Sequence, residues 1–142
     1  MTAYFFIVAQ HSGKVLDVYQ GSTEASAKII QYTKKSTDFD NQLWSFDNDG
    51  YIYNKKSGLV LDVTGSNIQD STPIIQYQKH PDQPGNQQWV YSDTDNTISL
   101  KSNSNYVLDV TGSSQDDGTP IILYHKTGNP NQRFTLHYYA TI

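Results

Sequence analysis

The sequence predicts an all-β protein made of three copies of one unit, and three repeated elements carry this prediction. Val-Leu-Asp-Val occurs at 15–18, 60–63 and 107–110, so its copies begin 45 and 47 residues apart. A tyrosine follows each aspartate by 15 residues, and Asn-Gln-x-aromatic ends each copy at 41–44, 86–89 and 131–134. Periods of this size are typical of repeat architectures. The copies, about 1–48, 49–95 and 96–142, fill the chain, so we expect a single domain over residues 1–142.

Each copy contains four short β-rich runs bounded by Gly, Pro, Asn, Asp and Ser, a pattern typical of all-β proteins. The first three strands are expected at 6–8, 16–18 and 29–32, at 51–53, 61–63 and 74–77, and at 98–100, 108–110 and 121–124. The fourth strand is expected to start at Asn-Gln-x-aromatic. No window keeps a 3.6-residue period, so no helix longer than one turn is expected. One such unit cannot bury its own apolar face. Three units around a pseudo-threefold axis solve this and remove sheet edges, which points to a β-trefoil.

The composition excludes several classes of function. Hydrophobic residues make up 36% and charged residues 17% of the 142, which is typical of a globular protein rather than a disordered one. The net charge is −4 and no run of Lys or Arg exceeds two, so nucleic acid is not an expected partner. Cysteine is absent, so no disulfide is expected.

We expect neither a membrane span nor a classical signal peptide in this chain. No apolar run approaches the length that crosses a bilayer, so no membrane insertion is expected. The first residues, 1–9, lack a basic start and are predicted to form a strand rather than a signal peptide. We therefore expect a cytoplasmic protein, or one released without a classical signal peptide.

Each copy brings together a carboxylate, an aromatic ring and an amide at nearly fixed spacing. Because side chains alternate along a strand, the Leu and Val of Val-Leu-Asp-Val are expected to face the core and the Asp the outer surface. An ionised carboxylate accepts strong hydrogen bonds from neighbouring hydroxyls. A tyrosine ring covers an apolar C–H face, and an amide both donates and accepts. This set suits the binding of a pyranose sugar.

The Gln-x-Trp elements at 42–44 and 87–89, with Gln132-Arg133-Phe134 as a variant, resemble the ricin-B-type (R-type) β-trefoil lectins. The resemblance covers nearly the whole chain. It implies a multivalent, agglutinating lectin with up to three shallow sites for galactose or N-acetylgalactosamine glycans, without a metal or cofactor. It also implies that the Asp, the aromatic ring, the Asn and the main chain of the residue two before the ring contact sugar, while the Gln supports the Asp. The implied carbohydrate-binding residues are Asp17, Ile30, Tyr32, Asn41, Gln42, Asp62, Ile75, Tyr77, Asn86, Gln87, Asp109, Ile122, Tyr124, Asn131 and Gln132.

Other interpretations of these residues stay open. The aspartates could accept turn N–H groups, the tyrosines could be core residues, and the glutamines could be purely structural. Trp44, Trp89 and Phe134 are expected in the core. Residues near each tyrosine either rim the sites or are plain solvated surface. These candidate rim residues are Lys34, Lys79, His80, His125 and Lys126.

No catalytic motif is present, so no enzymatic activity is expected. A glycosidase needs two carboxylates about 5–10 Å apart, whereas the repeated aspartates belong to separate copies. The alternative function is a β-trefoil protease inhibitor or another trefoil that binds proteins through its loops. The loop 80–85 is the segment most like an inhibitor loop. Both a monomer and a homodimer are compatible with the sequence.

Overall fold

A computed structural model describes residues 2–82 and 84–139 and contains four strands in each copy. The first copy holds β1 (Tyr4–Ala9), β2 (Val15–Val18), β3 (Ile29–Tyr32) and β4 (Trp44–Phe46). The second holds β5 (Ile52–Asn54), β6 (Val60–Val63), β7 (Thr72–Tyr77) and β8 (Trp89–Tyr91). The third holds β9 (Ile98–Leu100), β10 (Tyr106–Val110), β11 (Ile121–His125) and β12 (Phe134–Tyr139). The helices of the described residues are 3₁₀ turns of three residues each, as the sequence predicts.

The fourth strand of each copy begins later than predicted. It starts at the aromatic residue, while the Asn before it lies in a 3₁₀ turn. These turns are η2 (Asp40–Gln42), η4 (Pro84–Asn86) and η6 (Pro130–Gln132). In η2 the main chain pairs within the turn, through Gln42 N to Phe39 O at 2.8 Å. The turn leaves the Asn and Gln side chains free to bond elsewhere.

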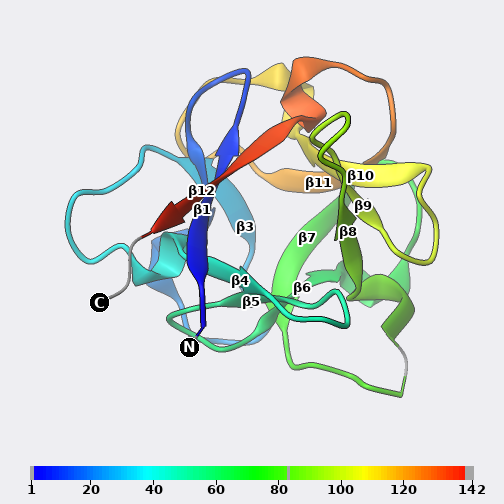
Figure 1. The fold of residues 1–142 in the computed structure, drawn as a ribbon, viewed down its shortest axis with the longest axis horizontal. Coiled ribbons are helices and arrows are strands. Elements are labelled where there is room, and N and C mark those ends of the chain that lie inside the picture. The colour runs from blue at the N-terminus through cyan, green and yellow to red at the C-terminus, as the bar shows by residue number, and fades with distance from the viewer. Residues whose placement is uncertain (1, 83, 140–142) are drawn as a thin grey trace.

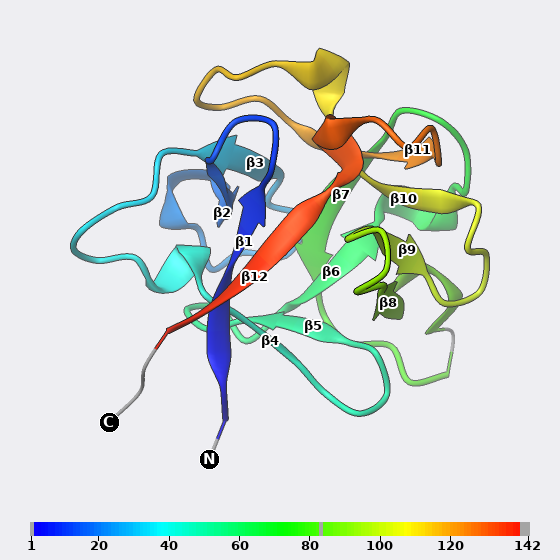
Figure 2. The same ribbon diagram turned by 45° about the horizontal axis from the view of Figure 1, so that its top comes forward.

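Six strands, two from each copy, form a closed barrel (Figures 1 and 2). β1 pairs with β4 and β12, β4 with β5, and β8 with β9. Hydrogen bonds from Trp89 N to Gly50 O and from Phe134 N to Asn96 O, both 2.8 Å, complete the ring. The first and last strands lie side by side, so the chain closes on itself and few strand edges stay open.

The other six strands form three hairpins, β2–β3, β6–β7 and β10–β11, which meet around the pseudo-threefold axis. Bridges join them in pairs: Lys28 with Ile75, Ile30 with Pro120, and Ile122 with Pro73. A six-stranded barrel with three hairpins is a β-trefoil, which confirms the predicted fold.

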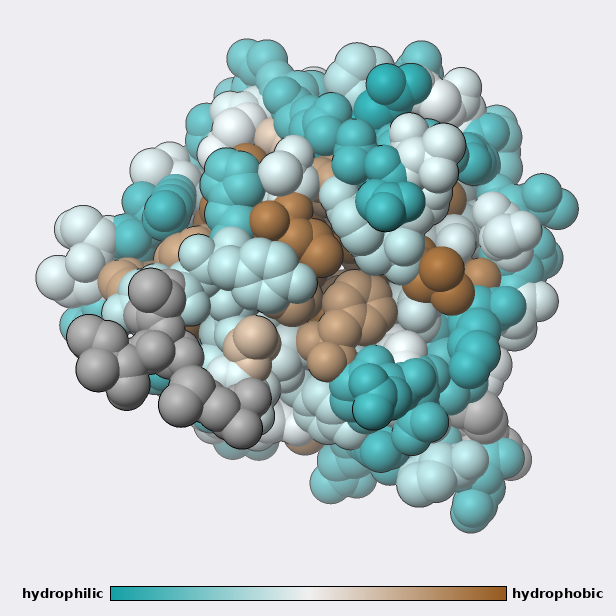
Figure 3. Space-filling view, viewed as in Figure 1, coloured by the Kyte–Doolittle hydropathy of each residue, from teal (hydrophilic) through white to brown (hydrophobic). Residues whose placement is uncertain are grey.

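One apolar core contains equivalent residues from all three copies. Leu16, Leu61 and Leu108 are fully buried, and Trp44, Trp89 and Phe134 are at most 1% exposed, as predicted. The tryptophans also donate from Nε1 to the carbonyls of Leu16 and Leu61, at 3.1 and 3.2 Å. Phe134 has no such donor. On the face in Figure 3, apolar residues gather at the centre and hydrophilic residues surround them.

Buried side chains fasten neighbouring copies together. Gln31 donates to the carbonyls of Ser114 and Asp116, at 2.7 and 2.9 Å, and Gln76 bonds the first copy's loop in the same way. The third copy has Leu123 at this position, fully buried in the core. The loops that these contacts hold border the cavities described next.

Candidate functional site

The repeated aspartates lie at the same place in each hairpin. Asp17 in β2 faces Ile30 in β3, and two residues away Val15 faces Tyr32. The same register pairs Asp62 with Ile75 and Asp109 with Ile122. This shared hairpin register explains the constant spacing of 15 residues between Asp and Tyr. It also places the Asp, the Ile and the Tyr of one copy around one point.

The strand alternation predicted that the aspartate carboxylates stand on the outer surface. In the structure, other side chains cover them. Asp17, Asp62 and Asp109 are only 4, 4 and 5% exposed. They do point away from the main apolar cluster, which includes their Leu and Val neighbours. The Asn and Gln side chains at η2, η4 and η6 cover them, and because these residues come from a later part of each copy, the alternation of one strand does not reveal this cover.

A fully buried glutamine holds each aspartate. Gln42 Nε2 donates to Asp17 Oδ2 at 2.9 Å and to Thr33 O at 3.0 Å, and its Oε1 accepts from Lys35 N. Gln87 and Gln132 donate to Asp62 and Asp109 at 2.8 and 2.9 Å. Among the described residues no backbone N–H donates to these carboxylates, which removes the turn-acceptor interpretation. The glutamines have the supporting role that the resemblance implies.

Each asparagine is tied to the end of the aspartate strand. Asn41 Nδ2 donates to Val18 O at 3.1 Å, and Asn86 Nδ2 donates to Val63 O at 3.1 Å. The third copy has two fewer residues between Asp and Asn, yet Asn131 Nδ2 still reaches Val110 O at 3.0 Å. Asn131 Oδ1 is buried without a hydrogen-bond partner among the described residues. It is therefore an unused acceptor at the third carboxylate.

Burial sets the electrostatics of the carboxylates. It raises the pKa of Asp17, Asp62 and Asp109 above the ordinary value of 3.8, although the hydrogen bonds from Gln42, Gln87 and Gln132 oppose this shift. The glutamines supply part of the polar surroundings that the carboxylates lose on burial. Hydroxyl donors from a ligand would supply more.

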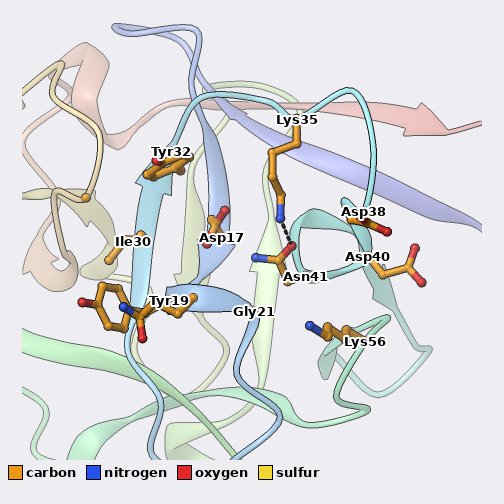
Figure 4. Close-up of a pocket in the computed structure, with 12 residues that line it drawn as sticks. Asp17, Tyr19, Gly21, Ile30, Tyr32, Lys35, Asp38, Asp40, Asn41 and Lys56 are labelled. Atoms are coloured by element: carbon orange, nitrogen blue, oxygen red, sulfur yellow. Dashed lines mark hydrogen bonds between the residues drawn. The ribbon is translucent and has the colours of Figure 1, made fainter.

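Three cavities open over these carboxylates, one in each copy. Site 1 is the cavity of about 720 Å³ above Asp17, and Figure 4 shows its lining. Sites 2 and 3, above Asp62 and Asp109, measure about 340 and 250 Å³. Each is lined by the predicted Asp, Ile, Tyr and Asn of its own copy. Tyr32 is 40% exposed, and Tyr77 and Tyr124 are half-buried, so these rings are not core residues.

Neighbouring copies complete the walls of the sites. Gly118 of the third copy lines site 1, Ser26 of the first lines site 2, and Ser71 of the second lines site 3. Each site thus lies at a junction between copies, and its shape depends on the assembled trefoil.

Site 1 also contains residues that the sequence reasoning missed. Lys35 Nζ donates to Asn41 Oδ1 at 2.8 Å, and Tyr19 and Lys56 line the same cavity. A signal for Tyr19 was available, because the equivalent residue after Val-Leu-Asp-Val is a threonine in the other copies, Thr64 and Thr111. No comparable signal marked Lys56, which comes from the neighbouring copy.

The candidate rim lysines do not line the sites. Lys34 Nζ lies 4.4 Å from the ring centroid of Phe6, and Lys79 Nζ lies 4.5 Å from that of Tyr51. Lys126 forms an ion pair with Asp95. Aromatic rings and a carboxylate outside the cavities attract these ammonium groups. In this structure Lys34, Lys79 and Lys126 are thus directed to partners outside the three cavities, which favours the solvated-surface interpretation.

The two candidate rim histidines differ. His80 lines site 2, with its ring centroid 5.4 Å from that of Tyr77. His125 lies 4.7 Å from Tyr124 in a stacked arrangement, but its Nδ1 bonds Asp70 Oδ2 at 2.8 Å. It is not among the residues that line site 3. His125 supports the tyrosine, and His80 borders a cavity itself.

Over residues 2–82 and 84–139, no group of three His, Asp or Glu side chains is placed to hold a metal ion. Within those same ranges, no helix is long and apolar enough to cross a membrane. The polar groups that line the sites are hydrogen-bond donors and acceptors.

The same framework occurs in known proteins. Residues 3–134 match the family model of the ricin-type beta-trefoil lectin domain. The chain belongs to this family. The assignment accounts for the triplicated Asp, Gln and Asn, and it confirms the resemblance carried by the Gln-x-Trp elements.

Individual proteins of known structure or sequence are similar to this chain. ThreeFoil, a designed threefold-symmetric protein, is 37% identical with a TM-score of 0.82, covering 94% of this chain and 97% of its own. The C-half of the earthworm R-type lectin, solved in complex with GalNAc, is 30% identical with a TM-score of 0.84, covering 96% and 99%. Mucoricin from Rhizopus delemar is 56% identical over 52 residues. That match spans 37% of this chain and only 35% of Mucoricin's length.

Proposed function

We propose that this ricin-type domain is a lectin that binds galactose and N-acetylgalactosamine glycans through its three sites. The observation that carries the proposal is the triplicated arrangement of a covered carboxylate beneath a solvent-accessible tyrosine. The earthworm lectin domain, which is similar over nearly its whole length, was solved with GalNAc. That complex supports a sugar of this class.

The chemistry of one site fits one pyranose. The Asp carboxylate accepts hydrogen bonds from two neighbouring hydroxyls, and charge-assisted bonds are the stronger kind. The Tyr ring stacks on the continuous apolar face that an axial 4-hydroxyl leaves on galactose. The Asn amide bonds a further hydroxyl, and the Ile from the facing strand fills the space beside the ring. Mannose has a different arrangement of hydroxyls and is the natural control.

Strength would come from the number of sites. A single shallow site is expected to bind in the millimolar to sub-millimolar range, about −4 to −5 kcal/mol. Simultaneous binding of clustered glycans raises the apparent affinity by about 10²–10⁴. Three outward sites on one chain would cross-link glycan-bearing surfaces without an oligomer. We therefore propose that the protein agglutinates such surfaces and acts by binding alone, without catalysis.

Calorimetric titration with galactose, N-acetylgalactosamine and mannose tests this proposal. We expect heat with both galactosides, none with mannose, and a stoichiometry that counts the functional sites. Binding should persist in EDTA, because no group at the sites needs a metal. Agglutination of galactose-coated beads, inhibited by free lactose, tests the multivalent action.

The alternative, an inhibitor acting through loops, predicts a different result. The candidate inhibitor loop spans 80–85, and residue 83 of this loop lies outside the described residues. If the protein inhibits a protease and gives no binding heat with any galactoside, the lectin proposal is contradicted and this alternative is favoured.

A further inference from the structure

Site 1 has a second region that sites 2 and 3 lack. This region offers an aromatic ring and hydrogen-bond donors to a second sugar. We propose that site 1 is an extended site that holds a galactose-terminated disaccharide, with the second sugar lying against Tyr19. The inference rests on the proposed function and specifies the ligand class of one site. Sites 2 and 3 would hold the terminal sugar alone.

The size of the cavity is the first reason. At about 720 Å³, site 1 has more than twice the volume of site 2, about 340 Å³, and of site 3, about 250 Å³. The Asp, Ile, Tyr and Asn are common to all three sites, so they do not cause the difference. The additional space comes from residues found only in site 1.

Tyr19 supplies a second aromatic surface. Its side chain is 40% exposed and lines the cavity. Lys28 Nζ lies 4.3 Å from its ring centroid, and Tyr19 N donates to Lys28 O at 3.0 Å, so both the ring and its main chain are held. Thr64 and Thr111 occupy this position at sites 2 and 3 and offer no ring. A held, exposed ring is a suitable stacking surface for a sugar.

Lys56 supplies hydrogen-bond donors across the cavity from Tyr19, beside Gly21. Its Nζ lies so close to Gly21 that a Cβ on this glycine would be only 2.8 Å away. The equivalents of Gly21 in the other copies are Ser66 and Ser113, which carry that Cβ. A glycine therefore allows the ammonium group to approach the main chain of the first copy, where it can donate to hydroxyls.

The two regions lie apart within one cavity. In Figure 4, Tyr32 lies above Asp17, while Tyr19 and Lys56 lie below it on opposite sides, Tyr19 on the left beyond Ile30 and Lys56 on the right. A terminal galactose bound at Asp17 and Tyr32 would thus extend its neighbouring sugar toward Tyr19.

The charge of the lining favours a neutral disaccharide over an acidic one. The charged residues that line site 1 are Asp17, Asp38, Asp40, Lys35 and Lys56. Three carboxylates and two ammonium groups give no positive excess, and Asp40 also pairs with Lys55 at 3.4 Å. An acidic sugar would meet no net attraction here.

Site-resolved titration of the ¹⁵N-labelled protein tests the proposal. The amide signals of Gly21, Gly65 and Gly112, which line sites 1, 2 and 3, report each affinity separately. The probes are methyl β-galactoside as the monosaccharide, and lactose, N-acetyllactosamine and melibiose as disaccharides. At site 1 we expect at least one disaccharide to bind about five- to tenfold more tightly than the monosaccharide, and no such gain at sites 2 and 3.

A matched variant assigns the gain to its cause. Tyr19→Thr gives site 1 the residue of the other two copies, and we expect it to bring the ratio of disaccharide to monosaccharide affinity at site 1 close to one. Gly21→Ser, again copying the other sites, should reduce that ratio by displacing Lys56, and the amide signal of Gln20, which also lines site 1, reports on this variant. Absence of a gain at site 1, an equal gain at all three sites, or a gain that persists in Tyr19→Thr would each overturn the proposal. If methyl β-galactoside and the disaccharides move none of the three glycine signals, the proposed lectin function itself fails.

Discussion

The three sites share the same floor but differ in their rims. The floor consists of the Asp, Gln and Asn side chains, and its Gln-to-Asp hydrogen bonds measure 2.9, 2.8 and 2.9 Å in sites 1, 2 and 3. The rim, meaning the lining residues beyond the shared Asp, Asn, Ile and Tyr, differs from site to site: Tyr19 and Lys35 border site 1, His80 site 2 and Asn129 site 3. The floor is buried and tied to the core, so it tolerates little change. The rim sits on exposed loops, where the copies diverge without disturbing the fold.

The largest effect on stability is expected from a core residue that packs beneath the floor of a site. Trp89 is 1% exposed, and its Nε1 bonds the carbonyl of Leu61, next to Asp62. Truncation in Trp89→Ala leaves a cavity and breaks this bond, so we expect the free energy of unfolding to fall by about 3–5 kcal/mol. Urea denaturation measures the loss. A variant as stable as the native protein would contradict the assigned core.

The third copy offers a control for this substitution. Phe134 fills the equivalent place without an N–H donor and is fully buried. Trp89→Phe should therefore cost only about 1–2 kcal/mol, for the lost hydrogen bond and the smaller ring. Equal losses for the alanine and phenylalanine variants would show that ring burial is not what stabilises this position.

The next largest effect is the loss of a single site. Asp62→Ala removes the carboxylate that accepts from Gln87 and, in the proposal, from two sugar hydroxyls. Affinity at site 2 should fall by about 100-fold or more, beyond detection for a site this weak. Calorimetry should then count one site fewer, while sites 1 and 3 are unchanged. A variant with Asp17, Asp62 and Asp109 all replaced by alanine that still binds galactosides normally would refute the assigned floor.

The pH dependence of binding distinguishes a buried floor from an exposed one. Burial raises the pKa of Asp17, Asp62 and Asp109 above 3.8, and the proposed hydrogen bonds need the ionised form. Galactoside affinity should therefore be full at neutral pH and fall as the pH drops through these raised pKa values. The fall should begin at a higher pH than an exposed aspartate would give, in titrations from about pH 7 to about pH 4. Constant affinity across this range would show that the carboxylates are not required.

The same shift acts on stability with the opposite sign. A carboxyl whose pKa is raised in the folded state contributes stability below its unfolded pKa of about 3.8, and this contribution is lost as the pH rises through the folded pKa. Asp62→Asn cannot ionise, so at neutral pH it should unfold no more easily than the native protein, although site 2 is lost. This variant separates the loss of binding from the loss of fold.

The floor could be predicted from the sequence because register fixes it. The spacing of 15 residues between Asp17 and Tyr32 reflects hairpin pairing that all three copies share. A side-chain period of two then settles which residues share a face. The predicted orientation of the aspartates was incomplete, because their burial depends on Gln42 and its equivalents, which arrive from another element.

The rim could not be predicted in this way because contacts between distant segments decide it. Spacing made Lys34 a rim candidate, yet Phe6, which is 28 positions earlier in the chain, attracts its ammonium group. Lys56 reaches site 1 from the second copy, and Gly118 from the third. Such contributions follow from the closed threefold arrangement rather than from the pattern of any one copy.

The smallest effects separate two neighbouring residues of one loop. His80 lines site 2 beside Tyr77, whereas Lys79 lies over Tyr51 and 3.9 Å from Asp47, outside the site. His80→Ala removes a flat surface from the rim and should weaken binding at site 2 by about two- to fivefold. Lys79→Ala should leave that affinity within about twofold and leave the stability of the protein nearly unchanged, because exposed ion pairs contribute little. The Gly65 amide signal reports the affinity of site 2 in both variants. If the Lys79 substitution weakens binding more than the His80 substitution does, the assignment of His80 to the rim of site 2 is wrong.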